Sequence, residues 1–168
     1  GKDDSGKLLK DLVAKDRIHV NGMMASTNRT TTTKTRVMAK NQHMIRLDEE
    51  TTQPLTIKEE HAFIDTCLRA IQIEVPDLVI FEDYNKGVLT ANVIEKIITH
   101  CKHVDVLTAV DPKKENFFAY KHVDIFKPNL KEIKETQDQI GFADVIVLNK
   151  VDAVSAEELA STLLFSIK

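Results

Sequence analysis

The sequence predicts an α/β protein in which a mostly parallel sheet is flanked by helices. Three short apolar runs, at residues 78–81, 104–110 and 123–126, have the β-branched and aromatic composition of buried strands. Stretches with helical spacing separate these runs, and such alternation is typical of βαβ units. Each run is followed at once by acidic residues, a lysine and a turn-forming residue, so a ligand site is expected where the strands end.

Local patterns predict the remaining elements. Helices are expected over 4–15 and 58–74, where apolar residues recur every three or four positions. Thr90 is a favourable N-cap for a third helix. Alternating residues over 31–39 and 43–48, with a turn between them, predict a β-hairpin. The sequence further predicts a short helical turn over 117–120, a strand over 143–148 and a helix that begins near 155.

Composition and charge limit the classes of function. The chain has 168 residues, of which 42% are hydrophobic and 29% charged, as in a single globular domain. A net charge of −3 without a basic block gives no electrostatic basis for binding nucleic acid or an anionic membrane. No apolar stretch reaches the length of a membrane span. Cys67 and Cys101 lack metal-ligand spacing, so free thiols and a cytoplasmic location are expected.

The segment 127–132 combines an asparagine and a glutamate at a predicted strand-to-helix junction. Asn129 and Glu132 stand three residues apart there, and a helix start offers free N–H groups to an anion. A capping box would account for the same two residues without any ligand. Residues 82–87 and 111–113 add carboxylates and lysines at the ends of two neighbouring strands. This arrangement predicts a cleft that handles phosphate and metal.

These motifs together resemble the PfkB-type, ribokinase-like carbohydrate kinases. The similar stretches are 1–6 (G-x-D-x-x-G), 31–37, 46–50, 83–89, 110–113 and 129–132 (N-x-x-E). The branch they resemble most is the D-glycero-β-D-manno-heptose-7-phosphate kinase of ADP-heptose synthesis. The resemblance covers residues 1 to about 135 and implies a ribokinase-like fold with a β-hairpin lid at 27–50. In that family the lid often forms the dimer contact, so a homodimer through the hairpin is one expected arrangement.

The resemblance also implies a reaction, in which the γ-phosphoryl group of ATP, with Mg²⁺, passes to a hydroxyl of a heptose 7-phosphate. Asn129 and Glu132 would hold the nucleotide, and Glu132 would also hold Mg²⁺, which takes oxygen ligands. The expected sugar-phosphate ligands are Lys34, Arg36, Asp83, Lys86, Asp111 and Lys113.

Several of these assignments have structural alternatives. Asp83 could instead cap the turn that follows it, and the lysines could be solvated surface residues. Asp111 and Lys113 could face either the nucleotide or the sugar. Glu82 stands where the family usually has a small residue, and its charge would repel a phosphate unless it points away.

The chain is expected to be an internal fragment, because it begins inside a family motif without a methionine. We expect one partial ribokinase-like domain over 1–168, incomplete at both ends, with a tail at 136–168 that departs from the family. The family's aspartate base belongs to a G-A-G-D signature that the sequence lacks, so no catalytic residue is identified and no kinase turnover is expected. The alternative is a non-catalytic module that binds sugar phosphate or assembles through the hairpin.

A weaker alternative is GTP binding. Asn149, Lys150 and Asp152 form N-K-x-D, the guanine-reading motif of GTPases, and residues 139–144 are similar to CobW-like metallochaperone GTPases. A GTPase also needs a phosphate loop of the form G-x-x-x-x-G-K-[ST]. The nearest approach begins at Gly1 and has Leu8 in the last position, so this requirement is not met in the sequence.

Overall fold

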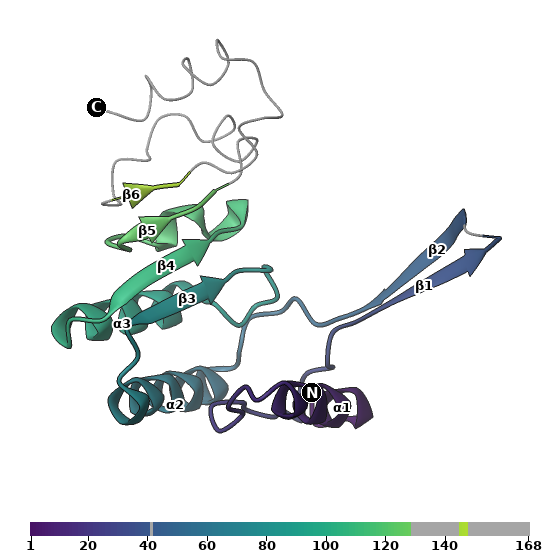
Figure 1. The fold of residues 1–168 in the computed structure, drawn as a ribbon, viewed down its shortest axis with the longest axis horizontal. Helices are drawn as coiled ribbons and strands as arrows, with labels where there is room; N and C mark the ends of the chain where they lie inside the picture. Colours follow the sequence, from purple (N-terminus) through teal and green to yellow (C-terminus); the bar gives the residue numbers. More distant parts are fainter. Residues whose placement is uncertain (41, 129–144, 148–168) are drawn as a thin grey trace, which may run out of the picture.

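The computed structural model describes residues 1–40, 42–128 and 145–147. In these residues a four-stranded parallel sheet is flanked by helices, and a two-stranded hairpin projects away from it (Figure 1). The predicted α/β class and the parallel sheet are therefore confirmed. In the part of the chain that is described, no helix is long and apolar enough to cross a membrane.

The helices begin at residues whose side chains cap their free N–H groups. Helix α1 (Asp4–Lys15) follows Asp3, whose carboxylate accepts from the N–H of Gly6 at 2.7 Å. Helix α2 (Ile57–Glu74) opens with a capping box between Thr56 and Glu59. Helix α3 (Ala91–His103) is capped by Thr90, as predicted. The 3₁₀ helix η1 (Lys114–Ala119) overlaps the turn expected at 117–120 but begins and ends earlier.

Asp3 also ties α1 to the segment that leads into the hairpin. Its other carboxylate oxygen accepts from the backbone N–H of buried Thr31 at 2.9 Å. Hydrogen bonds from Thr31 contribute most, and together with the smaller contribution from Gly6 they lower the pKa of Asp3 to about 2. The aspartate of the G-x-D-x-x-G stretch thus fixes the start of α1. The second glycine allows the chain to approach closely there, because a Cβ on Gly6 would lie 2.3 Å from the carbonyl oxygen of Gly1.

The sheet runs in the order β3, β4, β5, β6, with all neighbours parallel. Its strands are β3 (Leu78–Glu82), β4 (Leu107–Asp111), β5 (Ile125–Phe126) and β6 (Val145–Ile146). The prediction that a strand begins at Val104 is wrong. The N–H of Val104 bonds to the carbonyl of His100 at 3.1 Å and closes α3, and Asp105 then takes a positive φ of 59° before β4 starts.

One face of the sheet carries the core. Phe81 and Val110 point to this face, where α3 packs on the sheet and α2 packs on α3. The phenyl rings of Phe117 and Phe126 meet edge to face at 4.7 Å in the same cluster. The other face presents exposed apolar side chains, including Ile80 at 59% and Leu107 at 54%. Of the two predicted free thiols, Cys101 is buried and Cys67 partly buried.

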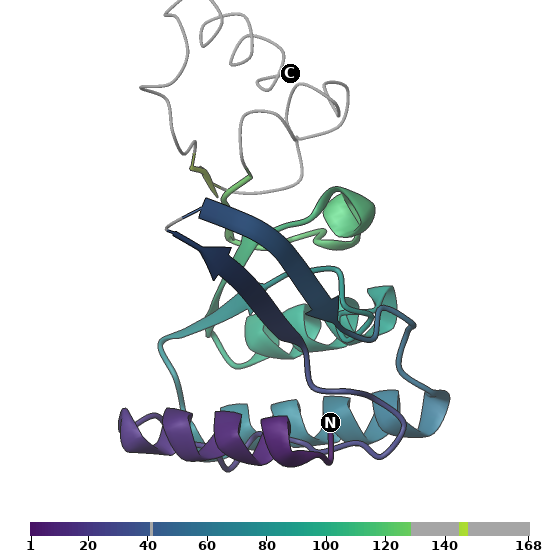
Figure 2. The same ribbon diagram turned by 90° about the vertical axis from the view of Figure 1, so that its right-hand side faces the viewer.

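The hairpin consists of β1 (Thr33–Ala39) and β2 (Gln42–Glu49), which pair antiparallel with an irregularity between Val37 and Met38. It confirms the hairpin predicted for this region. Figure 1 shows the hairpin extending outward, and in Figure 2 its strands lie in front of the rest of the molecule. Apart from Thr33, its described residues are exposed, so the hairpin is joined to the body only at its foot.

Candidate functional site

A set of hydrogen bonds, which we call the clamp, joins the base of the hairpin to the turn after β3. We call this base, where the chain enters and leaves the hairpin, the hairpin foot. The N–H of Leu55 donates to the carbonyl of Gly87 at 3.0 Å. The guanidinium of half-buried Arg29 donates to the carbonyl of Gln53 at 2.7 Å and also to the carbonyl of Lys86. Gly87 has a φ of 72°, and a Cβ there would lie 2.0 Å from the carbonyl oxygen of Gln53. Only glycine therefore allows the two segments to approach this closely.

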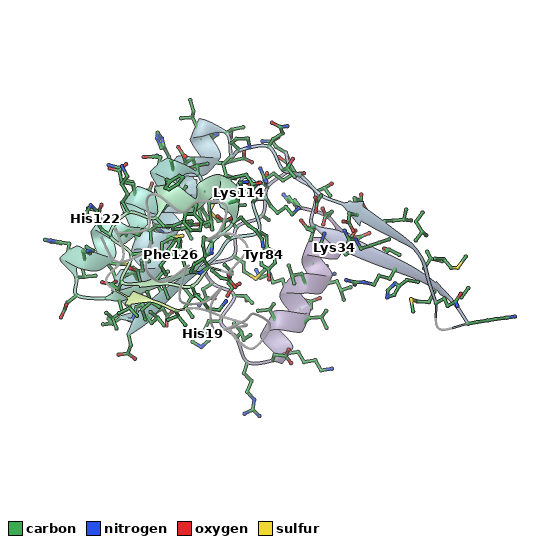
Figure 3. All side chains as sticks on the ribbon, turned by 90° about the horizontal axis from the view of Figure 1, so that it is seen from above. His19, Lys34, Tyr84, Lys114, His122 and Phe126 are labelled. Atoms are coloured by element: carbon green, nitrogen blue, oxygen red, sulfur yellow. The ribbon has the colours of Figure 1, made fainter. Side chains whose placement is uncertain are left out.

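The clamp places charged side chains from three sequence motifs next to one another. We call them the hairpin-foot cluster: Lys34, Arg46, Asp48, Glu50 and Lys86. The ammonium of Lys86 lies 2.6 Å from one carboxylate oxygen of Glu50, and that of Lys34 lies 3.4 Å from the other. Lys34 also lies 3.2 Å from Asp48, which pairs with Arg46 at 3.0 Å. Figure 3 labels Lys34 where the hairpin meets the body.

Electrostatics in the cluster favour the ionised carboxylates. The hydrogen bond from Lys86 lowers the pKa of Glu50, with smaller contributions from Lys34. Burial raises the pKa of Asp48, but hydrogen bonds from Lys34 and Arg46 outweigh it and the net shift is downward. The five side chains carry three positive and two negative charges, so the cluster has an excess of positive charge.

Arg36 lies on the same face of the hairpin, directly opposite Arg46 in the strand register. Like charges in this position destabilise a strand pair. In the described part of the chain, Arg36 has no carboxylate within ion-pair distance. Lys34 and Arg36, from the motif at 31–37, thus share one face of the hairpin, and Lys86, from the motif at 83–89, meets Lys34 at Glu50.

Asp83 is buried, with 4% of its surface exposed, and its carboxylate has three donors. One oxygen accepts from the N–H of Asn85 at 2.7 Å, so Asp83 does cap the turn after β3. The other accepts from the amide of Asn116 at 2.9 Å and the hydroxyl of Tyr120 at 2.8 Å. Burial of Tyr120, together with the bond to Asp83, raises the pKa of the Tyr120 hydroxyl. These contacts link the β3 turn to η1.

Asp111 ends β4 beside Asp83, the residue directly after β3, whose N–H donates to the Asp111 carbonyl at 3.3 Å. Its carboxylate lies 2.8 Å from the ammonium of Lys127, which follows β5. Lys113 is exposed two residues further on. A carboxylate and a lysine therefore meet at the carboxyl edge of the sheet, at Asp111 and Lys127.

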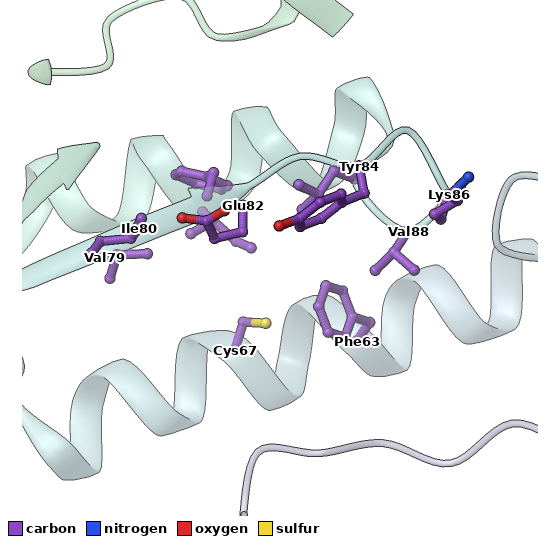
Figure 4. A pocket seen from close by; sticks show the side chains of 11 residues that line it. Phe63, Cys67, Val79, Ile80, Glu82, Tyr84, Lys86 and Val88 are labelled. Carbon is purple, nitrogen blue, oxygen red and sulfur yellow. The ribbon is translucent and has the colours of Figure 1, made fainter. Parts of the chain in front are cut away.

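A largely apolar cavity of about 390 Å³ lies between α2 and β3. Figure 4 shows Phe63 and Cys67 of α2 on one side, with Glu82 and Tyr84 on the other and Lys86 at one end. Glu82 thus lines this cavity and is not a member of the hairpin-foot cluster. Burial raises the pKa of the Cys67 thiol to about 11, so this cysteine is protonated at neutral pH.

Other predicted site residues lie outside the described part of the chain. These are Asn129 and Glu132, together with the N-K-x-D residues Asn149, Lys150 and Asp152. Among the described residues, no three His, Cys, Asp or Glu side chains gather as a metal site. Sequence reasoning missed the roles of Arg29, Glu50 and Lys127. A visible signal existed for Glu50, which follows Arg46 and Asp48 at every second position of the motif at 46–50.

Known proteins show two kinds of similarity to this chain. The bifunctional protein HldE of Rhodopseudomonas palustris is 36% identical over 137 residues, which is 80% of this chain and 28% of the relative. The bifunctional protein HldE of Gluconobacter oxydans is 32% identical over 158 residues, which is 94% of this chain and 33% of the relative. The chain therefore spans about a third or less of the length of these curated relatives.

The second similarity is to a family of nucleotide-binding domains. The family model described as "CobW/HypB/UreG, nucleotide-binding domain" matches residues 56–167, which is more than half of the chain. The match includes the N-K-x-D residues and the stretch at 139–144 that resembles CobW-like GTPases. It is this family, and not that of the PfkB kinases, whose model matches. The chain therefore belongs to the CobW/HypB/UreG nucleotide-binding domain family.

Proposed function

We propose that this chain forms the sugar-phosphate-binding part of a ribokinase-like kinase that acts on a heptose 7-phosphate. The observation that carries the proposal is the convergence of Lys34 and Lys86 on one side of the hairpin foot. Two ammonium groups that face the same carboxylate suit the phosphate of a phosphorylated sugar. The similarity to HldE proteins over 80% of the chain supports the same assignment.

The reaction would join a sugar hydroxyl oxygen to the γ-phosphorus of ATP and break the bond between that phosphorus and ADP. The hydroxyl proton would pass to a base that the described residues do not identify. Lys34, Arg36 and Lys86 would bind the substrate's own phosphate, and the clamp at Gly87 would hold Lys86 in place.

Mg²⁺ would neutralise charge on the transferring phosphoryl group. The chemistry of Glu132 fits it, because one carboxylate and the ATP phosphates can bind Mg²⁺ without a preformed cluster of protein ligands. Asn129 would help order the nucleotide. At the same sheet edge, Asp111 and Lys127 would face the bound ligands.

Binding of heptose 7-phosphate, measured by titration calorimetry, tests the proposal independently of turnover. We expect measurable binding to the chain and a loss of about 10- to 100-fold in affinity for Lys86→Met, because a charge-assisted hydrogen bond is removed. Lys96→Met, which removes an exposed lysine on α3, is the matched control and should bind like the unmodified chain.

Two outcomes would contradict the proposal. One is the absence of any heat with heptose or hexose phosphates. The other is an equal effect of Lys86→Met and Lys96→Met, which would mean that Lys86 contributes only its general charge.

The second candidate function is GTP binding, which the family match over residues 56–167 favours. Asn149 and Asp152 would read the guanine ring, and Lys150 would lie along it. Titration with a fluorescent GDP analogue should then give saturable binding that Asp152→Ala weakens by about 10-fold or more. Equal or absent binding in both proteins would remove this candidate.

A further inference from the structure

Glu50 is placed where a phosphate bound by the two lysines would have to lie. Each of its carboxylate oxygens faces a different ammonium group, Lys86 at 2.6 Å and Lys34 at 3.4 Å. The side chains are largely withdrawn from solvent, with 22% of Glu50 and 28% of Lys86 exposed. An external anion cannot use both lysines fully while this carboxylate remains between them.

We infer that Glu50 is an internal counter-ion of the sugar-phosphate site, and that a phosphate monoester dianion exchanges with its carboxylate for Lys34 and Lys86. This inference rests on the proposed function and adds a residue that sets ligand selectivity. A ligand must replace the attraction of Glu50 for two ammonium groups. A dianion with three oxygens can do so, whereas a singly charged carboxylate offers nothing that Glu50 does not already provide.

The surroundings give the displaced carboxylate little else to bind. Asp48 faces the same side of the hairpin and would repel it, and Arg46 is already paired with Asp48 at 3.0 Å. The backbone on both sides is fixed, because Arg29 holds the carbonyls of Gln53 and Lys86. Exchange therefore needs only rotation of the Glu50 side chain, without movement of the clamp.

Selectivity also follows from the low pKa of Glu50, which Lys86 lowers by hydrogen bonding. The carboxylate is thus fully charged at neutral pH and competes with every anion that approaches. Once phosphate has taken the lysines, the pKa of Glu50 should rise toward the ordinary glutamate range.

The test uses the whole chain with inorganic phosphate and acetate as probes at pH 8, measured by calorimetry. We expect the unmodified chain to bind phosphate and to show no detectable acetate binding. Glu50→Gln should bind phosphate about 3- to 10-fold more tightly and acetate measurably, because a partly exposed ion pair no longer competes.

Glu49→Gln is the matched control. It changes the net charge by the same amount, but Glu49 lies on the opposite face of β2, where its carboxylate accepts from the hydroxyl of Thr33 at 3.4 Å. Its phosphate affinity should therefore equal that of the unmodified chain. Equal tightening in both variants would overturn the inference in favour of a general charge effect.

A measurement on the unmodified chain covers the case in which Glu50→Gln does not fold. The pKa of Glu50, followed by carboxyl ¹³C NMR, should rise when phosphate is added, and an unchanged value would overturn the inference. If the chain binds phosphate but Glu50→Gln binds it no more tightly, only this inference fails. If neither phosphate nor heptose 7-phosphate binds to any variant, the proposed function fails with it.

Discussion

Asp83→Ala is expected to lower the free energy of unfolding by about 2–4 kcal/mol, as measured by urea denaturation. The substitution removes the acceptor for the Asn85 N–H, the Asn116 amide and the Tyr120 hydroxyl. Tyr120 is fully buried, so its hydroxyl would lose its partner without gaining water. Small domains are stable by about 5–15 kcal/mol in total, which makes this a large fraction of stability.

Glu82→Ala is the matched control for Asp83→Ala. Glu82 is the neighbouring acid at the end of β3, but its side chain is exposed, so we expect a change within about 0.5 kcal/mol. The comparison also separates the two roles considered for Asp83. If Asp83→Ala retained full stability and lost only affinity for heptose 7-phosphate, the carboxylate would serve the ligand and the structural account would be wrong.

Helix boundaries were predictable from the sequence because helix caps are local. Helix α1 spans the predicted residues, α2 begins one residue before the predicted start, and Thr90 caps α3 as expected. The start of β4 was not predictable in this way. Val104 has strand propensity, but its N–H completes the last turn of α3, and this helical hydrogen bond outweighs the weak preference of a single residue.

The candidate site was predictable only in part. Lys34 and Lys86 belong to motifs, so both could be proposed from sequence. Their meeting point could not, because Glu50 reaches Lys86 across 36 positions and Arg29 reaches the Lys86 carbonyl across 57. No periodicity in the sequence encodes contacts of that range. The guanidinium of Arg29 donates to backbone carbonyls, which every residue has, so no acidic partner in the sequence indicates its role.

Membership of a nucleotide-binding family and the proposed sugar-phosphate site are compatible in geometry. Parallel α/β sheets collect ligands at the carboxyl ends of their strands. In this chain those ends carry Asp111 and Lys127, while Lys86 stands on the turn after β3. The nucleotide and the sugar phosphate would therefore approach the same edge, on neighbouring strands, which phosphoryl transfer between them requires.

Gly87→Ala is expected to damage both the clamp and the site. Alanine would adopt the φ of 72° with strain, and its Cβ would fall 2.0 Å from the carbonyl oxygen of Gln53. Because the obstructing atoms belong to the backbone, the turn and the segment at 51–55 must move apart. We expect a loss of about 2–4 kcal/mol in unfolding free energy by urea denaturation. Affinity for heptose 7-phosphate should fall by at least about 10-fold, because Lys86 would leave Lys34.

Gly22→Ala provides the control, because a Cβ at Gly22 meets no atom within 4 Å, and neither stability nor binding should change. The pattern across variants is what identifies the clamp. Lys86→Met removes the charge and leaves the backbone in place, so it should reduce affinity while stability stays nearly constant. Gly87→Ala should reduce both together. If it lowered stability but left affinity intact, Lys86 would not depend on the clamp for its position, and this account of the site would be wrong.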